Sequence, residues 1–270
     1  MNRITQRLAA LKQEKRTALV SYVVSGDPTP TATLPAMHGL VEAGVDIIEL
    51  GVPFSDPMAD GPVIQLAHER ALANKTSLRK TLATVAAFRK TNSYTPVVLM
   101  GYANPIERMG YQAFAEAAVS AGVDGVLTVD LPPEEAKAFN AELQKVGIES
   151  IFLIAPTTTN ERMAMVAELA GGFLYYVSLK GVTGAGHLDI AAVEEKLAEI
   201  RALTDLPVCV GFGIKDAETA AAVARSADGV VVGSAFVNIM ATMAEREDSE
   251  IATALGAAAA AIRTGIDSIA

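Results

Sequence analysis

Tryptophan is absent from this 270-residue chain, and cysteine occurs only once, as Cys209. A single cysteine cannot build a disulfide framework, and its place in the apolar run Pro207–Val210 predicts a packed core thiol. Chains without disulfides are typical of reducing compartments, so we expect a cytoplasmic protein.

Long apolar runs and excess positive charge are also missing. No stretch of about 18 uninterrupted apolar residues predicts a membrane span. The charged segment Met1–Lys15 lacks the apolar stretch of a signal peptide. The formal net charge of −9 argues against a nucleic-acid surface or an anionic membrane surface. An anionic substrate would therefore have to be held by local backbone dipoles.

Apolar residues make up 51% of the chain, which is enough to bury a large core. The length fits one large domain of the α/β-barrel kind or two smaller ones, and we expect a single domain over residues 1–270. Short Val/Ile/Leu runs alternate with longer helical segments, which is typical of βα units and a parallel sheet. Eight runs are strand candidates: Ala18–Val24, Val45–Leu50, Pro96–Met100, Asp124–Val129, Glu149–Ile154, Phe173–Ser178, Pro207–Val210 and Gly229–Val232.

The segments between these runs have helical spacing, and similar turns precede several of them. The small residues and aspartates of 42–46, 120–124 and 225–229 each end a helix and lead into a strand. Eight such units predict a (β/α)₈ (TIM) barrel, with extra helices over Met1–Gln13 and Ile251–Ser268. An open doubly wound sheet is the alternative, but no Gly-x-Gly-x-x-Gly opens a helix after the first strand.

The most informative stretch is residues 45–62. Glu49 lies in a buried strand, flanked by Ile47, Ile48 and Leu50, and the three prolines that follow forbid a regular helix before about residue 62. The resulting stiff loop carries Asp56 and Asp60 and is longer than most strand-to-helix connections, which suggests a functional role. Burial raises the pKa of a carboxyl, as suits a group that holds and then gives a proton. Glu49 and Asp60 are therefore a candidate acid–base pair.

Structural alternatives exist for these acids. Glu49 could pair with a core tyrosine, since no Lys or Arg lies within the strand cores. Asp60 could cap the helix that begins near Pro62, and Asp130 before Leu-Pro-Pro is by residue type a cap or turn former. His38 and His68 lie in helical stretches and are interpreted as surface or packing residues. No His/Cys/Asp cluster has metal-ligand spacing, so no metal is expected.

Glycines follow the last three strands. Gly211 and Gly213, and then Gly233 with Ser234 at a probable helix start, would let backbone N–H groups approach an anion. Each alone could be a tight turn, but pairs after strands seven and eight favour a phosphate site. The segment 179–187 after strand six holds three glycines and is a candidate mobile lid.

Together these motifs resemble the tryptophan synthase alpha subunit family. The run Ile48-Glu49-Leu50-Gly51-Val52-Pro53-Phe54-Ser55-Asp56-Pro57 with Asp60-Gly61-Pro62 carries the resemblance, and four later motifs match in order and spacing. These are Asp130-Leu131-Pro132, Gly181-Val182-Thr183-Gly184, Gly211-Phe212-Gly213-Ile214 and Gly233-Ser234-Ala235.

The resemblance implies retro-aldol cleavage of indole-3-glycerol phosphate to indole and glyceraldehyde 3-phosphate. It implies Glu49 as the acid/base that protonates the indole carbon and Asp60 as the group that stabilises the positive ring. It further implies that Tyr22, Ile64, Met100, Leu127, Tyr175 and Thr183 bind substrate, and that Gly184, Phe212, Gly213, Gly233 and Ser234 bind phosphate.

The resemblance also implies an α₂β₂ tetramer with a beta subunit that carries pyridoxal phosphate, and no cofactor in this chain. The implied interface residues are Pro53, Phe54, Asp56, Pro57, Asn104, Pro105, Asp130, Leu131 and Pro132. A barrel that has lost catalysis and an isomerase or epimerase of phosphosugars are the competing functions. The first would have lost Glu49, Asp60 or a glycine, and the second would have metal-ligating histidines at strand ends.

Overall fold

The computed structural model describes residues 2–178, 189–211 and 213–269. Within them, eight parallel strands close into a barrel in the chain order β1 to β8, with β8 pairing back to β1. The barrel predicted from the sequence is thereby confirmed. The strands are β1 (Ala18–Val24), β2 (Ile47–Gly51), β3 (Val97–Gly101), β4 (Gly125–Thr128), β5 (Glu149–Ile154), β6 (Leu174–Val177), β7 (Val208–Gly211) and β8 (Gly229–Val232).

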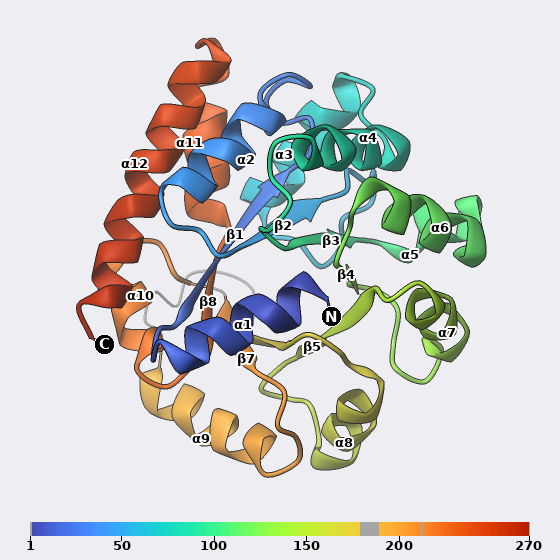
Figure 1. The fold of residues 1–270 in the computed structure, drawn as a ribbon, viewed down its shortest axis with the longest axis vertical. Helices are drawn as coiled ribbons and strands as arrows, with labels where there is room; N and C mark the ends of the chain where they lie inside the picture. The colour runs from blue at the N-terminus through green and yellow to red at the C-terminus, as the bar shows by residue number, and fades with distance from the viewer. Residues whose placement is uncertain (1, 179–188, 212, 270) are drawn as a thin grey trace.

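Twelve helices in the described residues surround the barrel or lie across one end of it (Figure 1). The first six are α1 (Arg3–Gln13), α2 (Thr33–Glu42), α3 (Pro62–Ala73), α4 (Leu78–Arg89), α5 (Ala103–Met109) and α6 (Tyr111–Ala121). The second six are α7 (Lys137–Lys145), α8 (Asn160–Leu169), α9 (Ile190–Arg201), α10 (Ala217–Ala224), α11 (Ser234–Thr242) and α12 (Asp248–Asp267).

The barrel interior is an apolar cluster, and α1 covers one end of it. Ile4, Leu8 and Leu11 of that helix pack with inward residues of the strands, among them Ile47 and Cys209, and with Phe173 just before β6. Cys209 is a free, fully buried thiol, as its apolar run predicted. Figure 1 shows α1 lying across the end of the barrel nearest the viewer. Because α1 covers the N-terminal ends of the strands, the barrel opens at the other end.

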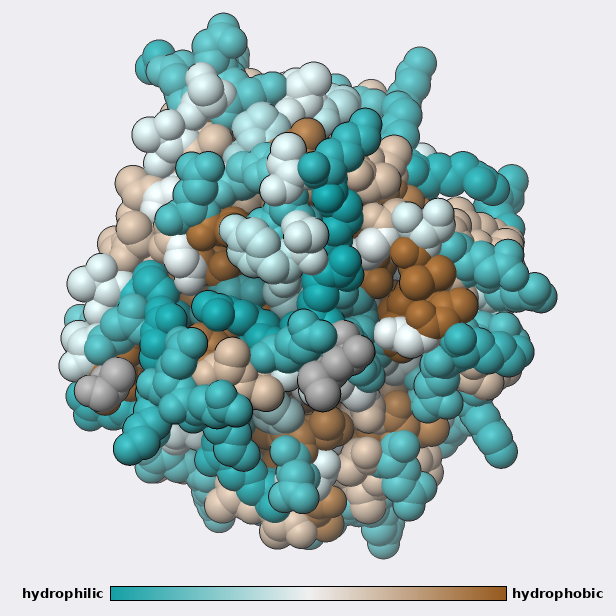
Figure 2. Space-filling model, in the orientation of Figure 1, coloured by the Kyte–Doolittle hydropathy of each residue, from teal (hydrophilic) through white to brown (hydrophobic). Residues whose placement is uncertain are grey.

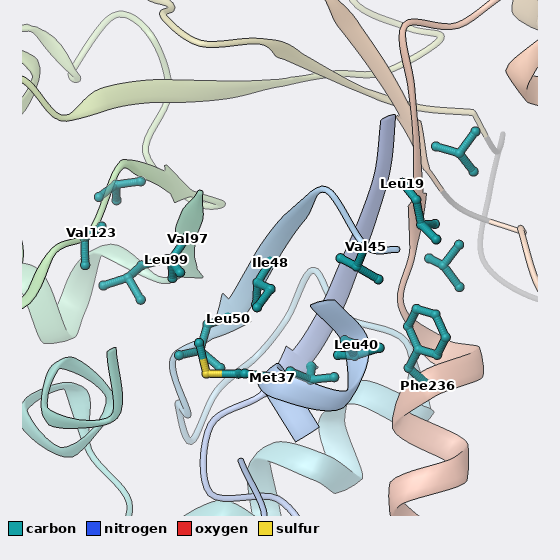
Figure 3. Packing of buried hydrophobic residues seen from close by; sticks show 14 of the residues in the cluster. Leu19, Met37, Leu40, Val45, Ile48, Leu50, Val97, Leu99, Val123 and Phe236 are labelled. Atoms are coloured by element: carbon teal, nitrogen blue, oxygen red, sulfur yellow. The ribbon is translucent and has the colours of Figure 1, made fainter. Parts of the chain in front are cut away.

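A second, larger core lies between the barrel and its outer helices. Figure 3 shows Ile48 and Leu50 of β2 pointing outward toward Met37 and Leu40 of α2, while Phe236 of α11 packs nearby. Alternate residues of one strand therefore serve two cores, which is why Ile48 and Leu50 face the helices and Glu49 between them faces the interior. Strands buried on both faces read as the continuous apolar runs seen in the sequence.

Both predicted extra helices are present. The C-terminal helix α12 packs along α2, α10 and α11 on the outside of the barrel (Figure 1). It begins at Asp248, earlier than predicted, because Glu247 and Glu250 form a capping box there. No helix in the described ranges is both long and apolar enough to cross a membrane. Figure 2 shows that the face carrying α1 is mostly hydrophilic, with apolar side chains in separate small patches.

The segment after β3 contains a short helix that was not predicted from the sequence. Asn104 and Pro105 belong to the first turn of the short helix α5, which begins at Ala103. Proline is tolerated in a first helical turn because the N–H groups there have no partner within the helix. This turn stays at the barrel mouth, directly after the strand.

Candidate active site

Glu49 points into the barrel from the C-terminal half of β2. Its backbone is in register with Tyr22 of β1 and Val98 of β3. The side chain is fully buried, and neither carboxyl oxygen has a hydrogen-bond partner within the described part of the chain. The alternative of a structural pair with a core tyrosine is therefore not supported. Burial, with a smaller contribution from the charge of Asp60, raises the pKa of Glu49 to about 8. Glu49 is thus a neutral acid at pH 7.

Asp60 is held in the loop between β2 and α3. Its amide donates to the carbonyl of Pro57, and the side chain of Gln65 donates to the carbonyl of Asp60. The hydroxyl of Tyr102 donates to Asp60 Oδ2 over 2.8 Å and itself accepts from the amide of Ala59. The N-cap of α3 is Gly61, so the alternative in which Asp60 caps that helix is wrong.

Tyr102 and His68 were not predicted to belong to this site. Tyr102 follows β3 and stacks on Phe54, with ring centroids 5.2 Å apart, which places its hydroxyl against Asp60. His68 lies on α3 with Nε2 3.5 Å from Asp60 Oδ2. A sequence signal for His68 does exist, because it falls in the helical stripe of Ile64, Ala67 and Ala71 and so faces inward.

The residues expected to form the slot for a flat ring lie together. Tyr22 and Ile64 belong to one buried cluster and Leu127 to the barrel interior, while Met100 packs against both and Tyr175 against the interior. The hydroxyls of Tyr22 and Tyr175 lie where a Cβ on Gly51 and Gly211 would be, so each ring requires a glycine in the neighbouring strand. Burial and then the charges of Glu49 and Asp60 raise the pKa of both tyrosines, which keeps their hydroxyls protonated.

The described residues expected to bind phosphate follow two strands that pair directly, Gly213 after β7 and Gly233 with Ser234 after β8. Gly213 has a left-handed φ of 79°, and Gly233 is the N-cap of α11, where no side chain in the described residues caps the helix. The helix start at Ser234 was predicted and is confirmed. A Cβ on Gly233 would lie 3.5 Å from Tyr22, so Tyr22 contacts both the carboxyl side and the phosphate side of the mouth. Thr183, Gly184 and Phe212, with the expected lid 179–187, lie outside the described residues.

The expected partner surface runs over the loops beside this mouth. Asp56 and Asn104 are exposed, while Pro53 is buried. Five more of its residues are half-buried: Phe54, Pro57, Pro105, Leu131 and Pro132. Asp130, also half-buried, accepts a hydrogen bond of 2.7 Å from the amide of Ala103 and so caps α5 from the neighbouring loop. Capping by Asp130 was one of the two roles considered from the sequence.

Neither a metal site nor a second site for the expected residues is found away from the mouth in the described part of the chain. Across the described ranges, no group of three or more His, Cys, Asp or Glu side chains is placed to hold a metal ion. A cavity of about 380 Å³ lies at the opposite end, where Thr17, Pro207 and Asp228 precede their strands. None of the expected site residues lines that cavity. The chemistry-bearing residues are therefore gathered at the C-terminal mouth, where barrel enzymes have their active sites.

The fold and the pair of carboxyls define a class, the α/β-barrel enzymes that use acid–base catalysis at the C-terminal mouth. The sequence model of one family, tryptophan synthase alpha chain, matches residues 8–263. The chain belongs to the tryptophan synthase alpha chain family.

Individual relatives agree with this assignment. The tryptophan synthase alpha chain of Dechloromonas aromatica is 57% identical over 270 residues, covering 100% of this chain and 99% of its own length. That of Methylococcus capsulatus is 58% identical over 248 residues, covering 92% and 93%. Among solved structures, tryptophan synthase subunit alpha from Legionella pneumophila has a TM-score of 0.91 at 46% identity, with 100% of both chains covered.

Proposed function

We propose that Glu49 and Asp60 cleave indole-3-glycerol phosphate to indole and glyceraldehyde 3-phosphate at the mouth of this barrel. By its family the chain is a carbon–carbon lyase of tryptophan biosynthesis. The observation that carries the assignment of residues is the burial of Glu49, whose carboxyl has no hydrogen-bond partner in the described residues and whose pKa burial raises to about 8.

Glu49 acts first as an acid. Its proton goes to the indole carbon that bears the glycerol chain, forming a C–H bond and leaving a positive charge on the ring nitrogen. A carboxyl with a pKa of about 8 holds this proton at pH 7 yet releases it more readily than a hydroxyl would. The dry interior keeps Glu49 in the neutral form that carries the proton before the transfer, because the carboxylate is disfavoured there.

Asp60 stabilises the charge that this transfer creates. Its carboxylate accepts a hydrogen bond from the ring N–H and faces the positive charge in a site with little water, where such an interaction is strong. The bond between the indole carbon and the glycerol carbon then breaks, and its electron pair restores the aromatic ring. The hydroxyl on the departing carbon loses its proton to Glu49 and becomes the aldehyde. Glu49 ends the cycle protonated, as it began.

The remaining residues position the two ends of the substrate. The side chains of Tyr22, Met100 and Leu127 provide an apolar slot for indole, with Ile64 and Tyr175 beside it. The amide of Gly213 after β7 and those of Gly233 and Ser234 at the positive end of α11 bind the phosphate in spite of the net negative charge. By resemblance, Gly184 and Phe212 complete the phosphate-binding set, and Thr183 binds substrate.

The same reasoning extends to the partner and the setting. We infer a beta subunit that carries pyridoxal phosphate and docks on the loops after β2, β3 and β4 in an α₂β₂ tetramer. Stiff proline-rich loops suit such docking, because little conformational freedom is lost on binding. A cytoplasmic location and a single barrel domain over residues 1–270 belong to this proposal.

The test is indole release by the isolated chain and by Glu49→Gln. Glutamine keeps the shape of the side chain but has no proton of the required acidity, so kcat should fall about 10²- to 10⁴-fold. Binding of glycerol phosphate should change little, because the anion site lies on the far side of Tyr22. A folded wild-type chain that binds glycerol phosphate but releases no indole would support the non-catalytic alternative. Unchanged turnover in the variant would remove Glu49 from the mechanism.

A further inference from the structure

His68 is almost completely buried, with 2% of its surface exposed. It lies two turns into α3, on the face that carries Ile64, Ala67 and Ala71 against the barrel. A helix face lined with small and apolar residues would accept another apolar side chain at this position. The presence of an imidazole there calls for polar partners, because an unpaired buried polar group is costly.

Both ring nitrogens face the loop between β2 and α3. The amide of Phe54 donates a hydrogen bond to Nδ1 over 3.0 Å. A nitrogen that accepts a hydrogen bond carries no proton, so the neutral ring has its proton on Nε2. The hydrogen bond from Phe54 therefore selects the tautomer that presents a donor on the other side of the ring.

The nitrogen that carries this donor lies near Asp60. Nε2 is 3.5 Å from Asp60 Oδ2, the oxygen that also accepts from Tyr102, and it has no hydrogen bond to any other described residue. The distance is a few tenths of an ångström longer than a good N–H···O hydrogen bond. Catalytic hydrogen bonds are often long in a free enzyme and tighten in the complex. A small movement of the Asp60 carboxylate toward the imidazole ring would bring Nε2 and Oδ2 within hydrogen-bond distance.

We propose that His68 is a positioning residue that orients the Asp60 carboxylate from the side opposite to substrate. The proposal rests on the role of Asp60 in the proposed lyase reaction. With Tyr102 and His68 both directed at Oδ2, Oδ1 is left to accept the ring N–H of the substrate. Once the hydrogen bond between Nε2 and Oδ2 forms, the imidazole links Asp60 to the backbone of Phe54, so that one side chain contacts both ends of the loop from 54 to 60.

Two substitutions separate the two contacts of the ring. The side-chain oxygen of asparagine lies near the position of Nδ1, so His68→Asn keeps an acceptor for Phe54 but removes the donor to Asp60. The longer glutamine places its amide near Nε2, so His68→Gln keeps the donor. We expect His68→Asn to lower kcat about tenfold with KM changed less than about twofold, the lower end of the effect of a hydrogen bond to a charged group. His68→Gln should keep kcat within about threefold of wild type.

The matched control is His38→Asn. His38 lies on α2, packs on Phe88 and contacts Thr91, with no link to the site, so its variant should keep the wild-type kcat. A purely structural role of His68 would lower the unfolding midpoint of both His68 variants and leave the kcat of folded protein unchanged. A wild-type kcat in folded His68→Asn, or an equal loss in both His68 variants, would overturn the proposal.

A measurement that needs neither variant nor activity completes the test. The chain has three histidines, so the ring nitrogens of His68 can be assigned by long-range ¹H–¹⁵N NMR on the wild-type protein. We expect the proton on Nε2 and a bare Nδ1. A proton on Nδ1, in the neutral or the cationic ring, is incompatible with the hydrogen bond from Phe54 and would refute the inference. Failure of the wild-type chain to release indole would instead refute the proposed function, whatever the state of this ring.

Discussion

The buried acid that we assign to catalysis should make the folded protein less stable as the pH rises. The pKa of Glu49 is raised from 4.5 to about 8 in the folded chain, chiefly because the carboxylate would lose its hydration there. The folded state therefore binds this proton more tightly than the unfolded state. The favourable contribution is fully present below about pH 4.5 and is lost as the pH rises toward 8.

The size of the effect follows from the shift. One pKa unit corresponds to about 1.4 kcal/mol, so leaving Glu49 in the interior costs roughly 4 kcal/mol at about pH 8 and less than about 1 kcal/mol near pH 5. Glutamine has no proton to lose. The free energy of unfolding of Glu49→Gln, relative to wild type, should therefore increase by about 3 kcal/mol between those two pH values. Any cost of burying the amide is a constant offset that does not change with pH.

Urea denaturation of wild type and Glu49→Gln between about pH 5 and pH 8 measures the difference in their free energies of unfolding directly. The other titrating groups are present in both proteins, so their contributions cancel. Glu116→Gln, on the exposed face of α6, controls for the loss of a glutamate at the surface. If the difference between Glu49→Gln and wild type stays flat with pH, Glu49 is ionised in the free protein. The acid role that we propose for it would then be wrong.

Two further outcomes follow from the same site. Because the reaction needs protonated Glu49, kcat/KM should fall about tenfold per pH unit above about pH 8, as measured by initial rates of indole release; a profile that rises through this range would contradict the assignment. Ser234→Asp should weaken binding of glycerol phosphate about tenfold or more, by repulsion between like charges at the start of α11, whereas the neutral Ser234→Asn should not. Equal affinities in calorimetry would place the phosphate elsewhere.

Much of the fold could be predicted because the signal is local. Strands buried on both faces have continuous apolar runs, and the predicted bounds of β1, β5 and β8 agree with the structure. Prolines set the start of α3 at Pro62, as expected. The short helix α5 was missed because seven residues containing a proline give little helical periodicity. The burial of Glu49 could be predicted in the same way, since it depends only on its strand.

The partners of Asp60 could not be predicted from the sequence. Tyr102 and His68 come from different elements, and both reach Asp60 only because the loop after β2 folds back across the mouth. The sequence gives the residue types of that loop but not its path. His68 was interpreted as a surface or packing residue, and its position in an inward helical stripe shows only that it is buried. Its function depends on what lies opposite.

The position of α1 has a consequence for the chemistry at the far end of the barrel. Ile4, Leu8 and Leu11 seal the floor of the interior, and Glu49 projects into that interior from β2. If the first 13 residues were removed, water could enter from beneath and hydrate the carboxylate, which would draw its pKa back toward that of an ordinary glutamic acid. A deletion of the N-terminal helix could thus abolish activity by hydrating the barrel interior, although every residue at the mouth would still be in place.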